Sequence, residues 1–217
     1  MTRRPRLLAT AAAGATAALL LTACGGSSDP KDNDKIAGAE TGSKTPTPPN
    51  TSPPTTGDRP KIELPADVSL TFSPEKTGDA IKDAILQDNA ELVRALDAAI
   101  EAQDPRFPAL EYYTEGEGAA AAQQWVQSFK DTGYTVTGAV RYFDRQVVLE
   151  SADKASLSYC ADESKGYNKV VKTGEIKKTQ ATKNSYVAYG VQVQKNAKGV
   201  WELVKIASTR GADRCQP

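Results

Sequence analysis

Apolar residues recur at helical spacing between residues 73 and 133. Five of them follow one another at intervals of four or seven, which predicts one or two amphipathic helices ending near residue 102: Ile81, Ile85, Leu92, Leu96 and Ile100. Ser73-Pro74-Glu75 is typical of a helix start. A further helix over residues 117–131 is expected to bury Trp125 and Phe129 and to end at Gly133.

After Gly133 the period changes to that of strands. Segments rich in Val, Tyr and Thr over residues 134–150, 155–160, 184–195 and 199–208 are separated by turn-forming residues. Helices followed by a run of strands predict an α+β domain, with N-terminal helices packed on a curved antiparallel sheet of about four strands. We expect the last two strands to contribute six core residues: Val187, Tyr189, Val191, Val193, Trp201 and Leu203.

The first 24 residues have the features of an export signal. Three arginines precede an apolar run over residues 7–21, which is too short and too rich in Ala to anchor as a membrane-spanning helix. Leu21-Thr22-Ala23-Cys24 resembles the bacterial lipoprotein signal, in which the Cys receives diacylglycerol and becomes the new N-terminus. Acyl chains on Cys24 would hold the protein on the extracytoplasmic face of the cell membrane. The alternative is an ordinary secretory signal with an incidental Cys, and the arginines leave the general and twin-arginine export routes both open.

Composition divides the chain into three parts. Residues 1–23 are the predicted signal peptide, and residues 24–65 hold eight of the 13 prolines and few large apolar residues, which predicts a disordered tether. Residues 66–217 are long enough for one domain with a single core. Removal of the signal leaves 24 basic and 27 acidic residues, a net charge of −3, and the chain contains no His. These facts argue against a nucleic-acid-binding protein and exclude catalytic and metal sites that depend on His, so we expect no metal and no cofactor.

Two cysteines remain once Cys24 is assigned to the lipid. In an oxidising compartment Cys160 and Cys215 are expected to form a disulfide. Cys160 ends the second predicted strand and Cys215 follows the fourth, and in an antiparallel meander these two ends lie at the same edge of the sheet. A reactive thiol pair is the alternative, although the two cysteines are far apart in the sequence.

The order of the predicted elements carries a resemblance to a known fold family. The helices, the strand opening at Tyr134 and the segment Gly199-Val200-Trp201-Glu202-Leu203-Val204 resemble the nuclear transport factor 2-like, cone-shaped fold. Residues 160–164, Lys172-Thr173-Gly174, the Gly-x-Trp strand and Cys215 are similar to a group of actinobacterial secreted lipoproteins of unknown function. The resemblance spans about residues 75–217. It implies a fold and an extracytoplasmic location. It does not imply an activity, because the wider fold includes isomerases, dehydratases and cyclases as well as domains that only bind ligands or partners.

Enzymes of this fold place an acid or base and several aromatic side chains inside the cone. The resemblance gives seven candidates here: Tyr112, Tyr113, Tyr142, Asp144, Tyr159, Tyr189 and Trp201. Burial among tyrosines would suit Asp144 to general-base catalysis. An exposed charge pair at a strand bend, together with ordinary aromatic core residues, is the alternative interpretation.

Charge is distributed unevenly along the domain, with a net −8 over residues 66–132 and a net +6 over residues 133–217. Six lysines in the connection between the second and third predicted strands are candidates for contact with anionic envelope polymers or the anionic membrane surface: Lys165, Lys169, Lys172, Lys177, Lys178 and Lys183.

Taken together, these patterns predict a lipid-anchored extracytoplasmic lipoprotein. We expect its domain to act as a non-enzymatic binding or accessory module for an envelope protein, a polymer or a small hydrophobic ligand, and to be capable of forming a homodimer. The alternative is a small-molecule enzyme of the isomerase or dehydratase type, or a ligand-binding protein, that uses a pocket in the cone. An open pocket favours this alternative, whereas a cone filled by Trp and Tyr side chains would oppose it.

Overall fold

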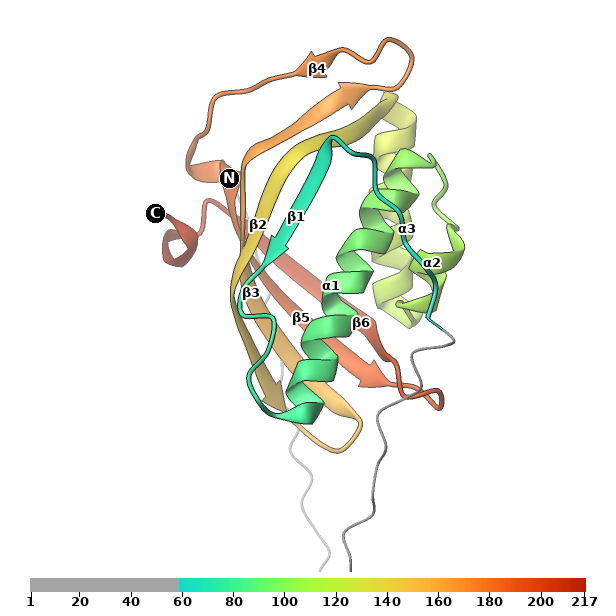
Figure 1. Cartoon of the computed structure of the whole chain (residues 1–217), viewed down its shortest axis with the longest axis vertical. Coiled ribbons are helices and arrows are strands. Elements are labelled where there is room, and N and C mark those ends of the chain that lie inside the picture. Colours follow the sequence, from blue (N-terminus) through green and yellow to red (C-terminus); the bar gives the residue numbers. More distant parts are fainter. Residues whose placement is uncertain (1–58) are drawn as a thin grey trace, which may run out of the picture. The chain divides into compact units, whose positions relative to one another are not determined.

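The computed structural model describes residues 59–217. The predicted signal peptide, the lipidation site Cys24 and most of the predicted tether lie outside the described residues. Within the described range three α-helices precede most of a six-stranded sheet (Figure 1). No helix in this range combines the length and the apolar character needed to cross a membrane.

The sheet contains two strands more than predicted. Its strands are β1 (Val68–Phe72), β2 (Tyr134–Leu149), β3 (Lys154–Val170), β4 (Ile176–Lys177), β5 (Tyr186–Lys195) and β6 (Trp201–Arg210). They lie in the order β1-β2-β3-β5-β6, and β4 pairs with the far end of β3. All pairs are antiparallel except β1, which runs parallel to β2. The predicted α+β architecture, with helices on a curved antiparallel sheet, is confirmed, while β1 and β4 were not anticipated.

Helices α1 (Ala80–Glu101), α2 (Pro108–Tyr112) and α3 (Gly116–Thr132) precede the long antiparallel strands. Helix α1 is continuous and begins at Asp79, whose carboxylate accepts from two backbone amides at 2.9 Å, rather than at Ser73. Ser73 follows β1 directly, so the chain uses the intervening residues to cross from the sheet to the helix layer. Helix α3 ends at Gly133 in the left-handed conformation with a φ of 69°, as predicted.

Helices α1 and α3 lie against one face of the sheet (Figure 1). The core between these layers contains apolar residues from both, among them Ile85, Leu86, Ile100, Val126, Leu157, Val191, Trp201 and Leu203. Val187 and Val193 are buried as expected, whereas Ile81 is 45% exposed. Ile81 lies in the first turn of α1, where the helix has not yet reached the core.

Cys160 and Cys215 form the predicted disulfide, with both residues buried and their Cα atoms 5.5 Å apart. Cys215 lies in a short 3-10 helix after β6. Cys160 lies in the middle of β3 rather than at a strand end, because β3 continues to Val170 and pairs with β2 along its length. Lys165 and Lys169 therefore belong to β3, which corrects the prediction that all six lysines lie in one connection.

The first described residues are tied to the domain by a buried ion pair. Arg59 forms a salt bridge with Asp88 of α1, whose side chain is fully buried. The second carboxylate oxygen of Asp88 accepts from the backbone N–H of Trp201 at 2.9 Å. Asp88 thus joins α1, β6 and the segment that leads into the domain.

Candidate functional site

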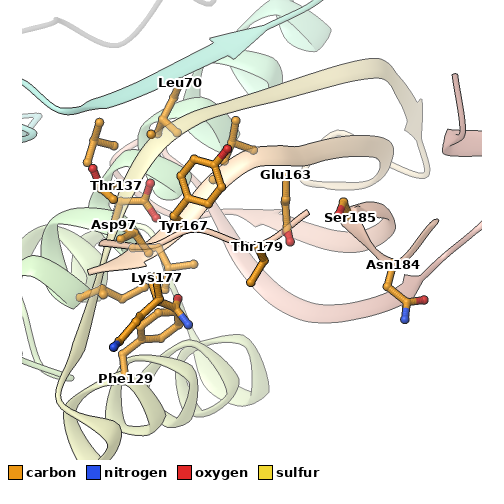
Figure 2. A pocket seen from close by; sticks show the side chains of 18 of the residues that line it. Leu70, Asp97, Phe129, Thr137, Glu163, Tyr167, Lys177, Thr179, Asn184 and Ser185 are labelled. Atoms are coloured by element: carbon orange, nitrogen blue, oxygen red, sulfur yellow. The ribbon is translucent and has the colours of Figure 1, made fainter. Parts of the chain in front are cut away.

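A cavity of about 590 Å³ opens between the helices and the sheet (Figure 2). Helices α1 and α3 form one wall, β1, β2 and β3 form another, and the connection around β4 contributes Lys177, Thr179, Gln180 and Thr182. Figure 2 shows Asp97 toward one end of this pocket and Asn184 at the other. Its volume lies within the range of sites that bind small organic molecules.

Aromatic side chains line much of the cavity: Trp125, Phe129, Tyr142, Tyr167 and Tyr189. Trp125 and Phe129 are one turn apart on α3 and meet edge to face, with ring centroids 5.5 Å apart. Trp125 is 45% exposed, so the prediction that it is a buried core residue is wrong. A helical period identifies the apolar face of α3, but the last turns of that face border the cavity instead of the core.

Asp97 of α1 is an acid in the cavity whose pKa lies well above its ordinary value. Burial, with a smaller contribution from the charge of Glu163, raises the pKa of Asp97 from its ordinary 3.8 to about 7. Among residues 59–217 no hydrogen bond or salt bridge lowers it. A carboxyl group in this state exchanges its proton near neutral pH.

Glu163, the second acid of the cavity, is held by protein partners. Its carboxylate accepts from the Arg210 guanidinium at 2.7 Å and from the Tyr189 hydroxyl at 3.4 Å. Arg210 also donates to the backbone carbonyl of Asn184 at 3.1 Å. Burial, followed by the charge of Glu163, raises the pKa of Tyr189, and the Tyr189 hydroxyl therefore keeps its proton. The two acids thus differ, since Glu163 has a positive partner and Asp97 has none in the described chain.

A column of stacked rings supports the floor of the cavity. Tyr142 stacks on Phe72 with centroids 5.1 Å apart and meets Tyr159 edge to face at 6.0 Å, and Tyr159 stacks on Tyr189 at 5.0 Å. Tyr142 and Tyr189 reach the cavity, whereas Tyr159 is buried beneath them, where burial raises its pKa to about 12. Burial, followed by the charge of Asp97, also raises the pKa of Tyr142.

Asp144, the predicted acid or base, lies outside the cavity and is exposed. A bulge in β2 between Phe143 and Gln146 gives Asp144 a positive φ of 51°, and its carboxylate accepts from Gln146 at 2.7 Å. Its other neighbour is Arg214, at 3.8 Å. The expectation that Asp144 is buried among tyrosines is wrong, because the bulge turns it to solvent.

The remaining candidates divide between the cavity and the core. Tyr142 and Tyr189 line the cavity, but Tyr113 and Trp201 are buried in the main core. Tyr112 packs against the edge of that core from α2. Asp97 was not predicted as a site residue, although a signal was present: it lies within the apolar stripe of α1, between Leu96 and Ile100, where an acid is unexpected.

The six lysines have different environments. Lys169 pairs with Asp67 at 2.9 Å, and Lys177 pairs with Glu175 at 2.6 Å while lining the cavity. Lys165 is exposed on β3. The other three are exposed on the connection after β3: Lys172, Lys178 and Lys183.

Comparison with known proteins gives structural likeness only. No family model matches the chain, and no curated protein matches it. Among solved structures, a ketosteroid isomerase-like protein from Erwinia carotovora atroseptica is similar at 19% identity and a TM-score of 0.34, over 55% of this chain and 90% of that one. A hexachlorocyclohexane dehydrochlorinase is similar at 13% identity and a TM-score of 0.40, over 62% and 90%. The intermembrane-space region of the chloroplast protein ARC6 is similar at 9% identity and a TM-score of 0.37, over 62% and 99%.

Sequence identities and TM-scores as low as these carry no inference about activity. The fold assignment is based on the elements of this chain. Its helices precede the long strands, and α1 and α3 pack against one face of the sheet, which agrees with the cone-shaped fold that the sequence resemblance implied.

Proposed function

We propose that this protein is a lipid-anchored extracytoplasmic lipoprotein whose domain binds a small, partly apolar molecule in the cavity between α1, α3 and the sheet. The observation that carries the proposal is the combination, in one cavity of about 590 Å³, of an aromatic wall and the carboxyl group of Asp97. Apolar surface supplies most of the affinity of small-molecule sites, and a few polar groups orient the ligand.

The packing of the domain supports this interpretation. Protein interiors are filled at close to crystal density, and unfilled apolar space costs stability. This domain has a close-packed core that includes Trp201, yet Trp125 and Phe129 border open space nearby. A cone filled by its own aromatic residues would have favoured a purely structural or partner-binding role.

Binding can be followed through Trp125, because it lines the cavity while the other tryptophan, Trp201, is buried in the core. The full chain would be reconstituted in vesicles of the uncharged lipid digalactosyldiacylglycerol and titrated with 4-phenyl-2-butanone, a small aromatic ketone. We expect a saturable change in Trp125 emission. The cavity-filling variant Val140→Phe should lose this response, and Val148→Phe, the same substitution on the exposed face of β2, should keep it. Equal responses in the two variants would contradict binding in the cavity.

The anchor is tested separately. A metabolically incorporated alkyne fatty acid should label the wild-type chain, and Cys24→Ser should abolish both the label and retention in the membrane fraction. Positive charge on Lys172, Lys178 and Lys183 supports the further proposal that this connection contacts an anionic surface. Changing these three to Gln should weaken binding to anionic vesicles, and unchanged binding would dismiss that contact.

Catalysis in the same cavity is the second candidate function, and the raised pKa of Asp97 is the observation that favours it. A carboxylate poised near neutral pH can take a proton from carbon next to a carbonyl group. Wild-type protein should then accelerate deuterium exchange at the α-carbons of 4-phenyl-2-butanone, and Asp97→Asn should not. Exchange at the same rate in both proteins would leave binding as the function.

A further inference from the structure

We infer that the ligand of this cavity is an organic cation, whose ammonium group pairs with the Asp97 carboxylate and whose apolar body packs on the surrounding aromatic rings. The inference rests on the proposed function and adds the chemical class of the ligand. Its basis is the unequal pairing of the charged side chains that line the cavity.

Each charged cavity residue other than Asp97 already has a partner of opposite sign. Arg210 binds Glu163 at 2.7 Å, and Lys177 binds Glu175 at 2.6 Å. Neither cation pairs with Asp97, and among the described residues no other side chain does so. Asp97 is half-buried, and a carboxylate withdrawn from water without a counter-charge is unfavourable. A ligand that brings a positive charge removes this penalty.

The rest of the wall suits the same ligand. The five aromatic residues of the cavity come from α3, β2, β3 and β5 and so line it from several sides. Negative ring faces attract ammonium groups, most strongly where water is excluded. The charge of Glu163 helps to raise the pKa of Asp97, but Glu163 is itself paired with Arg210, so Asp97 is the acid left to meet a cation.

A neutral ligand with a carbonyl group would require the opposite protonation state of Asp97. It would need Asp97 protonated, so that the carboxyl group can donate a hydrogen bond. The two ligand classes therefore differ in the direction of proton transfer on binding: a cation expels the proton of Asp97, and a carbonyl compound retains or recruits it.

Calorimetry with two probes distinguishes these possibilities. The full chain in digalactosyldiacylglycerol vesicles, which carry no ammonium group, would be titrated at pH 7 with (2-phenylethyl)trimethylammonium, whose charge is permanent, and with 4-phenyl-2-butanone. Each titration would be run in phosphate and in PIPES, buffers without net positive charge and with different heats of ionisation. Because the pKa of Asp97 is about 7, the cation should release about half a proton per site. The other ionisable groups on the wall, which the titration must take into account, are Glu163, Lys177, Arg210, Tyr142, Tyr167 and Tyr189.

The variants assign the proton to one residue. Asp97→Asn should weaken cation binding about 10- to 100-fold, remove the proton release and leave ketone binding unchanged or stronger. Asp97→Glu, which keeps the charge, should retain proton release, and Asp213→Asn, on an exposed acid outside the cavity, should behave as wild type.

Three results would overturn the inference: tighter binding of the ketone than of the cation, proton uptake with the cation, or cation binding that Asp97→Asn leaves intact. If the ketone binds in the cavity and the cation does not, the proposed function stands and only the ligand class is wrong. If neither probe changes Trp125 emission in wild type or in Val148→Phe, the proposed function itself is contradicted.

Discussion

Replacing Asp97 by Asn should make the unliganded protein more stable at alkaline pH. Folding moves Asp97 from water, where its pKa is 3.8, to a site where its pKa is about 7. The folded state then binds the Asp97 proton more tightly than the unfolded state does. Stability therefore falls as the pH rises from about 4 to about 7, and above pH 7 the ionised carboxylate carries its full penalty. Asn resembles the protonated carboxyl group in shape and carries no charge at any pH.

The magnitude follows from the difference between these two pKa values. At about 1.36 kcal/mol for each pKa unit, the difference corresponds to about 4 kcal/mol above pH 7. Water in the open cavity screens the charge, so we expect a gain of about 1 to 3 kcal/mol at pH 8. At pH 5 Asp97 is protonated in the folded state, and the gain from Asn should be smaller.

Urea unfolding at pH 5 and at pH 8, followed by far-ultraviolet circular dichroism, measures both values. Asp213→Asn serves as the matched control, since Asp213 is an exposed acid outside the cavity, and its effect should be within about 0.5 kcal/mol at either pH. A gain from Asp97→Asn that is equal at the two pH values, or a loss at pH 8, would refute the argument that the Asp97 charge is unneutralised in the empty cavity.

Three further predictions concern the scaffold of the site, and each is measured by urea unfolding. Asp88→Ala should cost about 3 to 5 kcal/mol, because it leaves the Arg59 guanidinium and a buried backbone N–H unpaired, whereas Arg106→Ala, at an exposed ion pair, should cost less than about 1 kcal/mol. Replacing both members of the Cys160–Cys215 disulfide by Ala should cost about 4 kcal/mol, from the entropy of a 55-residue loop. Gly138→Ala should cost about 2 kcal/mol or more, because its φ is +95° and a Cβ would collide with the carbonyl oxygen of Lys165. A smaller loss from Asp88→Ala than from Arg106→Ala would contradict the first of these.

The sequence predicts the helices and long strands of this fold better than its two short strands, β1 and β4. Helical and strand periods identified α1, α3 and four long strands, because those elements bury one face, although the predicted strand over residues 155–160 covers only part of β3. Strand β1 has five residues, and it owes its place to pairing with β2, a partner more than 60 residues away. Strand β4 has two residues and no period at all. Elements of this size depend on the partner they meet, which local patterns do not contain.

The site was harder to predict than the fold for a related reason. Asp144 and Asp97 both lie beside apolar residues in the sequence, but a bulge in β2 turns the first outward while the regular period of α1 carries the second into the cavity. A bulge shifts the alternation of a strand by one residue and so reverses the side on which later residues lie. On a helix the period has no such ambiguity. An acid within an apolar helical stripe was therefore the stronger signal. Helix α1 carries two such acids: Asp88, which pairs with Arg59, and Asp97, which lines the cavity.

The stability of the empty domain and its affinity for a cation should have one origin. An ionised Asp97 without a partner destabilises the folded state, and a bound ammonium group neutralises its charge. The residue that lowers the stability of the empty domain therefore supplies binding energy for the cation. The two effects must then change together. Asp97→Asn should raise the unfolding free energy at pH 8 and lose the stabilisation that (2-phenylethyl)trimethylammonium gives to the wild type, whereas Asp97→Glu should show neither change. A variant that gained stability while keeping its full response to the cation would separate the two effects and place the ammonium group elsewhere in the cavity.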